Sequence, residues 1–424
     1  IRLCLFIYFW EKIRNDMQGT IIFDKNYHIK KQFLELFFYM FIILSVFDQS
    51  REAFPIPNVL NSMIPLIRDV LILYFFIRNF SKKINSLFVL LPCMLFFMVI
   101  IGFLNIHSIK VVKEMWNYLK FFLIYYVFSN EEIFISNRKK FLLFYLRCVL
   151  ILFIFNVIVV FCFSAFLTRL FSAGLRLTVG NSSIVSYLYI SALIIVLYFE
   201  VVRHRIIYIV MYILAIVSTV TTTAFVAIIP ILFIYFVTQL NIKQKVIVLF
   251  FTFIVLCVLI NVISSISLLS SFLDYLKEKG EQLFELLSFN SDISSVGTLS
   301  ARELQKRNLL SNMTFMDYIF GLGFSGYNKY IDFMVENQFI TFIGLFGLVG
   351  VFFVVFILAR FFITSIFTVN VYNLTIISVF LCYCYTLVIF LPYASNFVTA
   401  FLFALSNFYI NTNKNRFYIM RKNI

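Results

Sequence analysis

Long runs of apolar residues, separated by short polar connections, fill most of the chain. A helix that crosses a bilayer needs about 20 predominantly apolar residues, and fewer when polar residues at its ends reach the headgroups. On this criterion the pattern predicts an all-α polytopic membrane protein with about twelve transmembrane helices. The predicted helices are Phe33–Phe47, Ser62–Ile77, Ser86–Leu104, Val111–Phe128, Phe141–Leu167, Ser182–Phe199, Ile206–Thr219, Thr222–Thr238, Val246–Ser267, Asn337–Arg360, Asn370–Leu391 and Tyr393–Ile410.

The distribution of Lys and Arg predicts which side of the membrane each connection faces. Basic residues gather in alternate connections, whereas the short connections between them carry few. Because cytoplasmic loops hold the excess of basic residues, we expect both termini in the cytoplasm. The chain then divides into a cytoplasmic segment 1–32, spans one to nine within 33–267, a large periplasmic loop 268–336, spans ten to twelve within 337–410 and a basic cytoplasmic tail 411–424.

The large loop is the longest hydrophilic stretch of the chain, and it is predicted to be partly helical. Ser270–Phe289 places its apolar residues on one face and its charged residues on the other, which is typical of an amphipathic helix. A second helix is expected at about Leu299–Asn312. Its first turn would be capped by Thr298 or Ser300, and Glu303 follows Ser300 at the spacing of a capping box.

Composition agrees with a membrane protein and argues against other classes. The 424 residues are 62% hydrophobic and 13% charged, which is outside the range of soluble globular domains. The net charge of +15 is spread in short clusters between apolar runs, as topology signals are, so no nucleic-acid partner is expected. Most of the seven cysteines lie inside apolar segments, so neither a disulfide framework nor a metal site is predicted.

Three basic residues, Arg68, Lys120 and Arg147, lie inside predicted spans, and Arg147, near the inner end of its long span, is expected to extend to the headgroups there. Arg68 follows the outer end of the second span by about one and a half turns and precedes Asp69, and Lys120 lies deeper in the fourth span. An ionisable group at such a depth is a candidate functional residue. The alternative is that both side chains extend to the outer headgroups.

Span ten carries three glycines in a segment that otherwise consists of bulky residues. Gly344, Gly347 and Gly350 are spaced by three. This spacing predicts a nearly smooth stripe along the helix, against which a neighbouring helix could pack closely.

Three local patterns accompany the predicted topology. They are Leu175–Asn181, which contains Arg176, Gly180 and Asn181 before a span; Ser300-Ala301-Arg302 followed by Gly321-Leu322-Gly323; and Glu336-Asn337 followed by Gly344 or Gly347. Together with the layout, they resemble the Wzy-type O-antigen polymerases and the related O-antigen ligases of bacterial lipopolysaccharide assembly.

The chain departs from the family pattern at two places. Thr221-Thr222-Thr223 stands where the family has Thr-Ser-Arg, and Glu336 stands where the ligases carry a His at the end of the loop. Both departures make the resemblance closer to the polymerases than to the ligases.

The resemblance implies a glycan transferase of the bacterial inner membrane with its active site facing the periplasm. It would transfer a growing glycan from undecaprenyl diphosphate to a hydroxyl of another lipid-linked repeat unit, and a chain-length regulator protein is a further expected partner. An O-antigen ligase or another lipid-linked glycan transferase is one alternative. A flippase for the same lipid-linked units is the alternative of another class; it predicts internal repeats, and none is obvious in the sequence.

The candidate site residues follow from the chemistry of the departing diphosphate. A guanidinium group offers a planar fork to phosphate oxygens, so Arg176 and Arg302 are the predicted catalytic residues for charge stabilisation. Glu336 is the predicted base for the acceptor hydroxyl, although a carboxylate at a helix N-terminus is also favoured by the helix dipole. Neither a metal nor another cofactor is required. The predicted substrate-binding residues are Arg68, Arg169, Arg307, Asn181 and Asn337.

Overall fold

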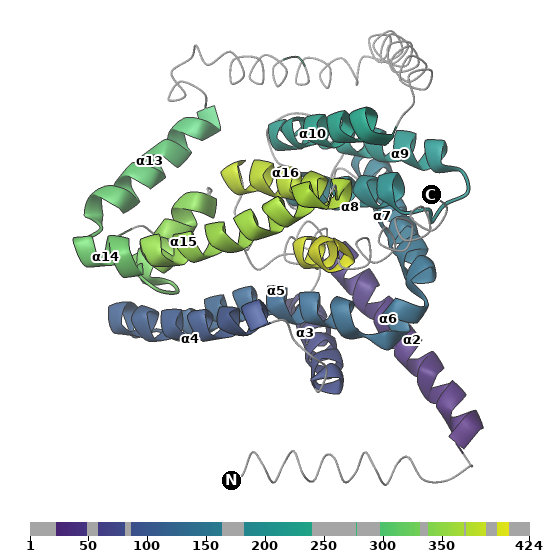
Figure 1. The fold of residues 1–424 in the computed structure, drawn as a ribbon, viewed down its shortest axis with the longest axis horizontal. Helices are drawn as coiled ribbons and strands as arrows, with labels where there is room; N and C mark the ends of the chain where they lie inside the picture. Colours follow the sequence, from purple (N-terminus) through teal and green to yellow (C-terminus); the bar gives the residue numbers. More distant parts are fainter. Residues whose placement is uncertain are drawn as a thin grey trace.

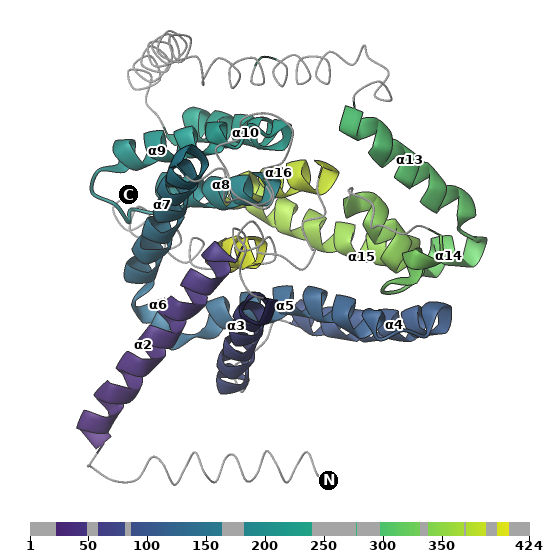
Figure 2. The same cartoon turned by 180° about the vertical axis from the view of Figure 1, so that it is seen from behind.

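The structure is a computed structural model that describes residues 23–48, 58–80, 86–162, 182–239, 277, 297–330, 338–368, 370–386 and 397–406. Within these ranges the regular elements are helices, and no strand is present. The prediction of an all-α fold is therefore confirmed. Figures 1 and 2 show the helices from opposite sides.

The helices coincide closely with the apolar runs. Every predicted span that falls on described residues overlaps one helix, and Val246–Ser267 lies outside the described residues. The elements are α2 (Phe23–Phe47), α3 (Asn58–Asn79), α4 (Ser86–Ile106), α5 (Lys110–Asn130), α6 (Glu132–Ser136), α7 (Arg138–Cys162), α8 (Ser182–Tyr198), α9 (Arg205–Ser218), α10 (Thr222–Gln239), α13 (Gly297–Asn312), α14 (Phe315–Phe320), the 3₁₀ helix η4 (Gly326–Lys329), α15 (Gln338–Phe367) and α16 (Val371–Thr386). The segment Phe397–Ser406 is also helical.

Two stretches among the described residues are long and apolar enough to cross a membrane. They are Arg138–Val160 in α7, with 23 residues, and Phe339–Phe367 in α15, with 29 residues. Other apolar helices, such as α8 and α9, have between 10 and 17 residues. Length and composition thus identify two membrane-spanning candidates directly.

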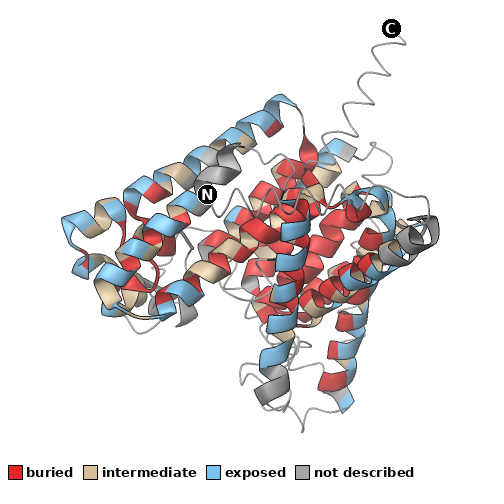
Figure 3. Ribbon diagram, turned by 90° about the horizontal axis from the view of Figure 1, so that it is seen from below, coloured by how far each residue is buried: buried red, intermediate tan, exposed pale blue. Residues whose placement is uncertain are grey.

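Helix α8 forms the centre of the core. It packs against α7, α9, α10 and α16, and every residue from Ile184 to Leu197 is buried. A helix that is apolar on all sides is suited to such an interior position or to contact with lipid. Figure 3 shows that the buried residues gather in the middle of the molecule, while the helices at its edge carry exposed residues.

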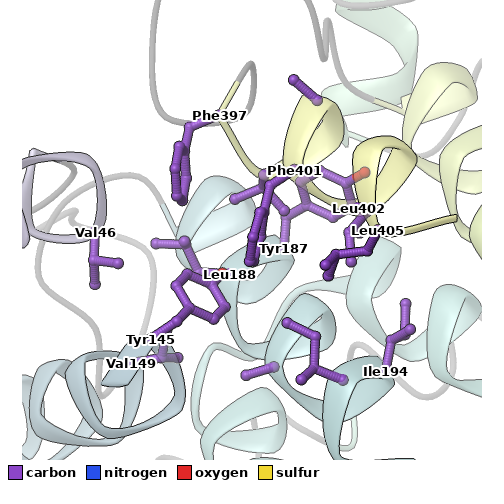
Figure 4. Packing of buried hydrophobic residues seen from close by; sticks show 14 of the residues in the cluster. Val46, Tyr145, Val149, Tyr187, Leu188, Ile194, Phe397, Phe401, Leu402 and Leu405 are labelled. Atoms are coloured by element: carbon purple, nitrogen blue, oxygen red, sulfur yellow. The ribbon is translucent and has the colours of Figure 1, made fainter. Parts of the chain in front are cut away.

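Hydroxyl groups inside this core are paired across helices. Tyr145 on α7 and Ser191 on α8 form a hydrogen bond of 2.6 Å, and Ser186 on α8 bonds Tyr383 on α16 at 2.7 Å. Around them, aromatic and aliphatic side chains such as Phe401 fill the space between α7, α8 and the segment Phe397–Ser406 (Figure 4). Pairing is necessary because a buried hydroxyl without a partner is costly.

Charged side chains join the end of α3 to the end of α5, and the middle of α2 to the start of α7. The buried carboxylate of Glu131, just after α5, accepts a 2.6 Å hydrogen bond from Asn79 Nδ2 and lies 3.8 Å from Arg78. Glu35 on α2 pairs with Lys140 on α7 at 3.0 Å. Arg78 and Lys140 both belong to the connections that the distribution of basic residues assigns to the cytoplasm, so the packing groups residues predicted for the same side.

The large loop differs from its prediction in two respects. The second predicted helix exists as α13, but it begins at Gly297. The prediction of a cap at Thr298 or Ser300 is therefore wrong, because both residues lie within the helix. A capping box is present one helix later, where Thr314 and Asp317 bond each other reciprocally at the start of α14. The sequence did not predict α14, because a helix of six residues is too short to show a periodic apolar pattern. The predicted helix Ser270–Phe289 lies outside the described residues except at Lys277.

The Tyr145–Ser191 pair makes a testable contribution to stability. Ser191 Oγ also donates to the Leu188 carbonyl at 2.6 Å, so the Tyr145 hydroxyl donates to Ser191. Ser191→Ala should lower the free energy of unfolding by about 1–3 kcal/mol because the tyrosine hydroxyl loses its acceptor. Thermal unfolding in detergent measures this. The double variant Ser191→Ala/Tyr145→Phe should recover part of the loss, and strictly additive losses would contradict the pairing.

Candidate functional site

Helix α15 is interrupted at Gly347. This residue has φ +62° and ψ −173°, a conformation outside the helical region that is essentially restricted to glycine. The break interrupts the regular hydrogen bonds of the helix at this point. As a result, the carbonyl oxygens of Gly344 and Leu345 are open to other donors.

The end of the large loop supplies those donors. Leu322 N donates to the Gly344 carbonyl at 2.7 Å, and Gly323 N donates to the Leu345 carbonyl at 3.1 Å. The glycines of the two sequence patterns thus contact each other directly. At Gly347 the stripe of glycines in span ten does receive a close neighbour, the last turn of the short loop helix α14: a Cβ atom on Gly347 would overlap the carbonyl of Ile319.

The same segment packs on its other side against α4. Phe324 N donates to the Met98 carbonyl at 3.3 Å, and Gly323 lies directly against Gly102. A Cβ on Gly323 would overlap the backbone nitrogen of Gly102, and a Cβ on Gly102 would overlap the Phe324 carbonyl. Two glycines are therefore required for the loop to approach α4 this closely.

Glu114, in the first turns of α5, fixes the next residue of the segment. Ser325 has a left-handed backbone, with φ 58°, and both its N–H and its hydroxyl donate to Glu114 Oε2, the hydroxyl at 2.8 Å. Burial and then the nearby Glu114 charge raise the pKa of Tyr327, so its phenol stays protonated. Glu114 Oε1 has no hydrogen-bond partner among the described residues, so it can accept a further hydrogen bond.

Aromatic side chains close the interior of this junction. The rings of Tyr118 on α5, Phe324 in the segment and Phe346 on α15 lie 5.2 to 5.9 Å apart. Both phenylalanines are buried. Ring pairs at these distances stabilise the contact beyond simple area burial, so the segment is anchored by side chains as well as by its backbone.

The opposite face of α5 takes part in a buried network of charges. Arg68 Nη1 on α3 pairs with Asp48 at the end of α2 at 2.5 Å, and Asp69 lies 3.7 Å from Arg68 Nε. Asp69 also accepts hydrogen bonds from Trp116 Nε1 at 2.7 Å and from Lys120 Nζ at 3.3 Å on α5. Two cations and two carboxylates therefore balance in an interior position, which offsets the cost of burying each charge alone.

Helix α5 therefore connects two different environments. At 100° per residue, Glu114 and Tyr118 fall on one side of the helix, while Trp116 and Lys120 fall on the other. The first side holds the end of the loop, and the second side holds the charge network. A displacement of α5 would therefore disturb both the end of the loop and the charge network.

The structure describes only part of the predicted site. Arg68 is buried and paired with Asp48, and Lys120 is buried and paired with Asp69, so the alternative that both side chains reach the outer headgroups is wrong. Arg302 and Arg307 both lie on α13, and the Arg307 side chain is exposed. The other predicted site residues lie outside the described residues: Arg169, Arg176, Asn181, Glu336 and Asn337.

Sequence reasoning missed the residues that hold the junction together. Glu114 is a single carboxylate near the start of an apolar run, and Asp48 follows the end of another. The local sequence shows no role for either carboxylate, because no partner lies near it along the chain. Their partners are Ser325 and Arg68, which are distant along the chain. An acidic residue within a membrane-length apolar run was the available signal.

The comparisons with known proteins supply no relative. No model of a known protein family matches the chain, and no curated protein matches it.

The break in α15 predicts different effects for two glycine variants of the same helix. Gly347→Ala should lower the free energy of unfolding by about 1–3 kcal/mol, because alanine does not tolerate this backbone conformation, and should detach the loop. At Gly344 a Cβ would meet the flexible end of Leu309 at 3.0 Å, so Gly344→Ala should change stability by less than about 1 kcal/mol. Thermal unfolding and limited proteolysis in detergent would compare the two, and equal effects would contradict the break.

The buried ion pair predicts that Arg68 is required for stability. Arg68→Ala should cost about 3–5 kcal/mol because Asp48 loses its closest charged partner, whereas Arg68→Ala combined with Asp48→Ala should cost less. Arg147→Ala on α7, which removes an exposed arginine, is the matched control and should be nearly neutral. If thermal unfolding of Arg68→Ala equals that of the control, the network does not stabilise the fold.

Proposed function

We propose that the protein is a membrane-embedded glycan polymerase of the Wzy type. It transfers a growing glycan from undecaprenyl diphosphate to a hydroxyl of another lipid-linked repeat unit, at the periplasmic face of the bacterial inner membrane. The support consists of the three sequence patterns, the predicted topology of about twelve spans, and the contact between two of these patterns across the break in α15.

A lipid environment is supported by the side chains that the helices expose. Large apolar residues point outward from different helices, among them Phe96 on α4, Phe233 on α10 and Phe352 on α15, which are 65%, 66% and 74% exposed. Extensive exposed apolar surface is unfavourable in water and favourable against acyl chains. It therefore supports the placement of these helices in a bilayer.

The contact between the loop and α15 is the observation on which the proposal chiefly rests. Leu322 and Gly323 bond the two carbonyls opened by the break at Gly347. Helix α13 joins the same junction, because its buried Leu309 packs against Gly344. Arg302 lies on α13, seven residues before Leu309, so this arginine belongs to a helix that packs against α15.

The proposed reaction needs charge stabilisation and a base. The acceptor hydroxyl loses its proton to a base while its oxygen attacks the anomeric carbon, and the bond from that carbon to the diphosphate oxygen breaks. Arg302 and Arg176 stabilise the charge of the departing diphosphate, and Glu336 takes the proton. The substrate partners are undecaprenyl-diphosphate-linked oligosaccharides, and no metal takes part.

Substitution of Arg302 tests the proposal. Arg302→Ala should leave the protein in the membrane but reduce long O-chains to single-repeat lipopolysaccharide, and Arg302→Lys should restore little, because lysine lacks the planar fork. Arg176→Ala should behave in the same way. Lipopolysaccharide gels provide the measurement, with Lys306→Gln as the control that removes a positive charge from the same helix and should keep long chains. Normal long chains in both arginine variants would refute the assignment.

The buried charges of the first spans favour one alternative, a transporter of lipid-linked units. Ionisable residues inside membrane helices frequently line transport pathways, and Arg68, Asp69 and Lys120 fit that description. Deletion of the gene separates the possibilities. Loss of a polymerase leaves single-repeat lipopolysaccharide, loss of a flippase removes the O-chain, and loss of a ligase leaves polymer on the lipid carrier.

A further inference from the structure

The irregular segment that follows α14 satisfies its backbone donors entirely within the protein. Every N–H group from Gly321 to Gly326 donates to a protein acceptor. In chain order the acceptors are the carbonyls of Asp317, Gly344, Leu345 and Met98, the carboxylate of Glu114 and the carbonyl of Gly323. A loop at the surface leaves such groups to water. Irregular backbone at membrane depth occurs only where the protein satisfies it, and this segment meets that condition.

The segment also lies below the ends of the helices that it contacts. Gly102 lies four residues before the end of α4 at Ile106, and Gly347 lies nine residues after the start of α15 at Gln338. At about 1.5 Å per residue, these positions are roughly 6 Å and 13 Å along the two helices. If both helices cross the bilayer, the segment lies below the outer headgroups.

Helix α14 presents large apolar side chains at the same level. Phe315, Met316 and Phe320 are 75%, 63% and 45% exposed. Beside the break, Leu348 and Val349 on α15 are also exposed. The exposed apolar residues of α14 therefore lie at the same depth as the exposed apolar residues of α15.

The polar side chains of α14 are hydrogen-bonded within the loop. Asp317 accepts from the Thr314 backbone at 2.9 Å and from the Thr314 hydroxyl at 2.8 Å, and the Tyr330 hydroxyl donates to it at 3.4 Å. Tyr318 donates its hydroxyl to the Leu310 carbonyl at 2.6 Å. The N-terminal cap and both tyrosines are thus bonded within the loop, which lowers the cost of placing this short helix among acyl chains.

We propose that α14 and the segment up to Phe324 form a re-entrant element of the outer leaflet. Phe315, Met316 and Phe320 contact lipid acyl chains, so the end of the loop is inserted in the bilayer rather than placed in water as the hydrophilic character of the loop predicted. The proposal rests on the membrane setting of the proposed function, but it does not depend on glycan transfer.

Tryptophan quenching in reconstituted bilayers tests this placement. The chain has only two tryptophans, so the fluorescence added by Phe315→Trp or Phe320→Trp can be measured against the parent protein. Most of the added fluorescence should be lost with lipids brominated on their acyl chains and retained with aqueous iodide. Lys110→Trp, at the exposed first residue of α5 in the outer connection between α4 and α5, is the control and should show the reverse.

Two results would overturn the proposal. Quenching of Phe315→Trp by iodide to the extent seen with Lys110→Trp would place α14 in water. Resistance to both quenchers would place these side chains against protein, such as a second copy of the chain. The measurement requires no substrate, so a failure of the transferase assignment leaves its outcome unchanged, and a failure here leaves the lipopolysaccharide assay to be decided separately.

Discussion

The backbone hydrogen bonds between the end of the large loop and the break in α15 determine how the loop is placed. A continuous helix would use the carbonyls of Gly344 and Leu345 internally. The conformation of Gly347 releases them, and Leu322 and Gly323 occupy them. Because unsatisfied backbone groups are costly in an apolar interior, the break and the inserted segment stabilise each other.

Helix α5 extends this constraint to the first spans. One side of it holds the inserted segment through Glu114 and Tyr118, and the other side holds Asp69 through Lys120 and Trp116. The loop, the charge network and the helices α2 to α4 are thereby packed as connected parts. A diphosphate-binding site that combines residues of the loop with residues of the spans, as proposed, requires a loop held in this way.

The positions of the helices could be predicted from the sequence, because an apolar run of membrane length is a local signal. The candidate site could be predicted only in part. The pattern of glycines marked Gly323 and Gly347, but their mutual contact depends on a break in a helix whose apolar pattern is continuous. The partnership of Glu114 with Ser325, and of Arg68 with Asp48, depends on which helices are neighbours. A single sequence does not encode that information in any local pattern.

The inserted segment can be examined directly by hydrogen–deuterium exchange of the amides from residue 321 to 326, in protein reconstituted in lipid nanodiscs. All these amides donate to protein acceptors, so the account predicts slow exchange, comparable with that of the buried amides of α5. Gly347→Ala should accelerate it. Exchange of the parent protein at the rate of an unstructured, water-exposed loop would contradict the insertion and with it the proposed arrangement of the loop on the membrane helices.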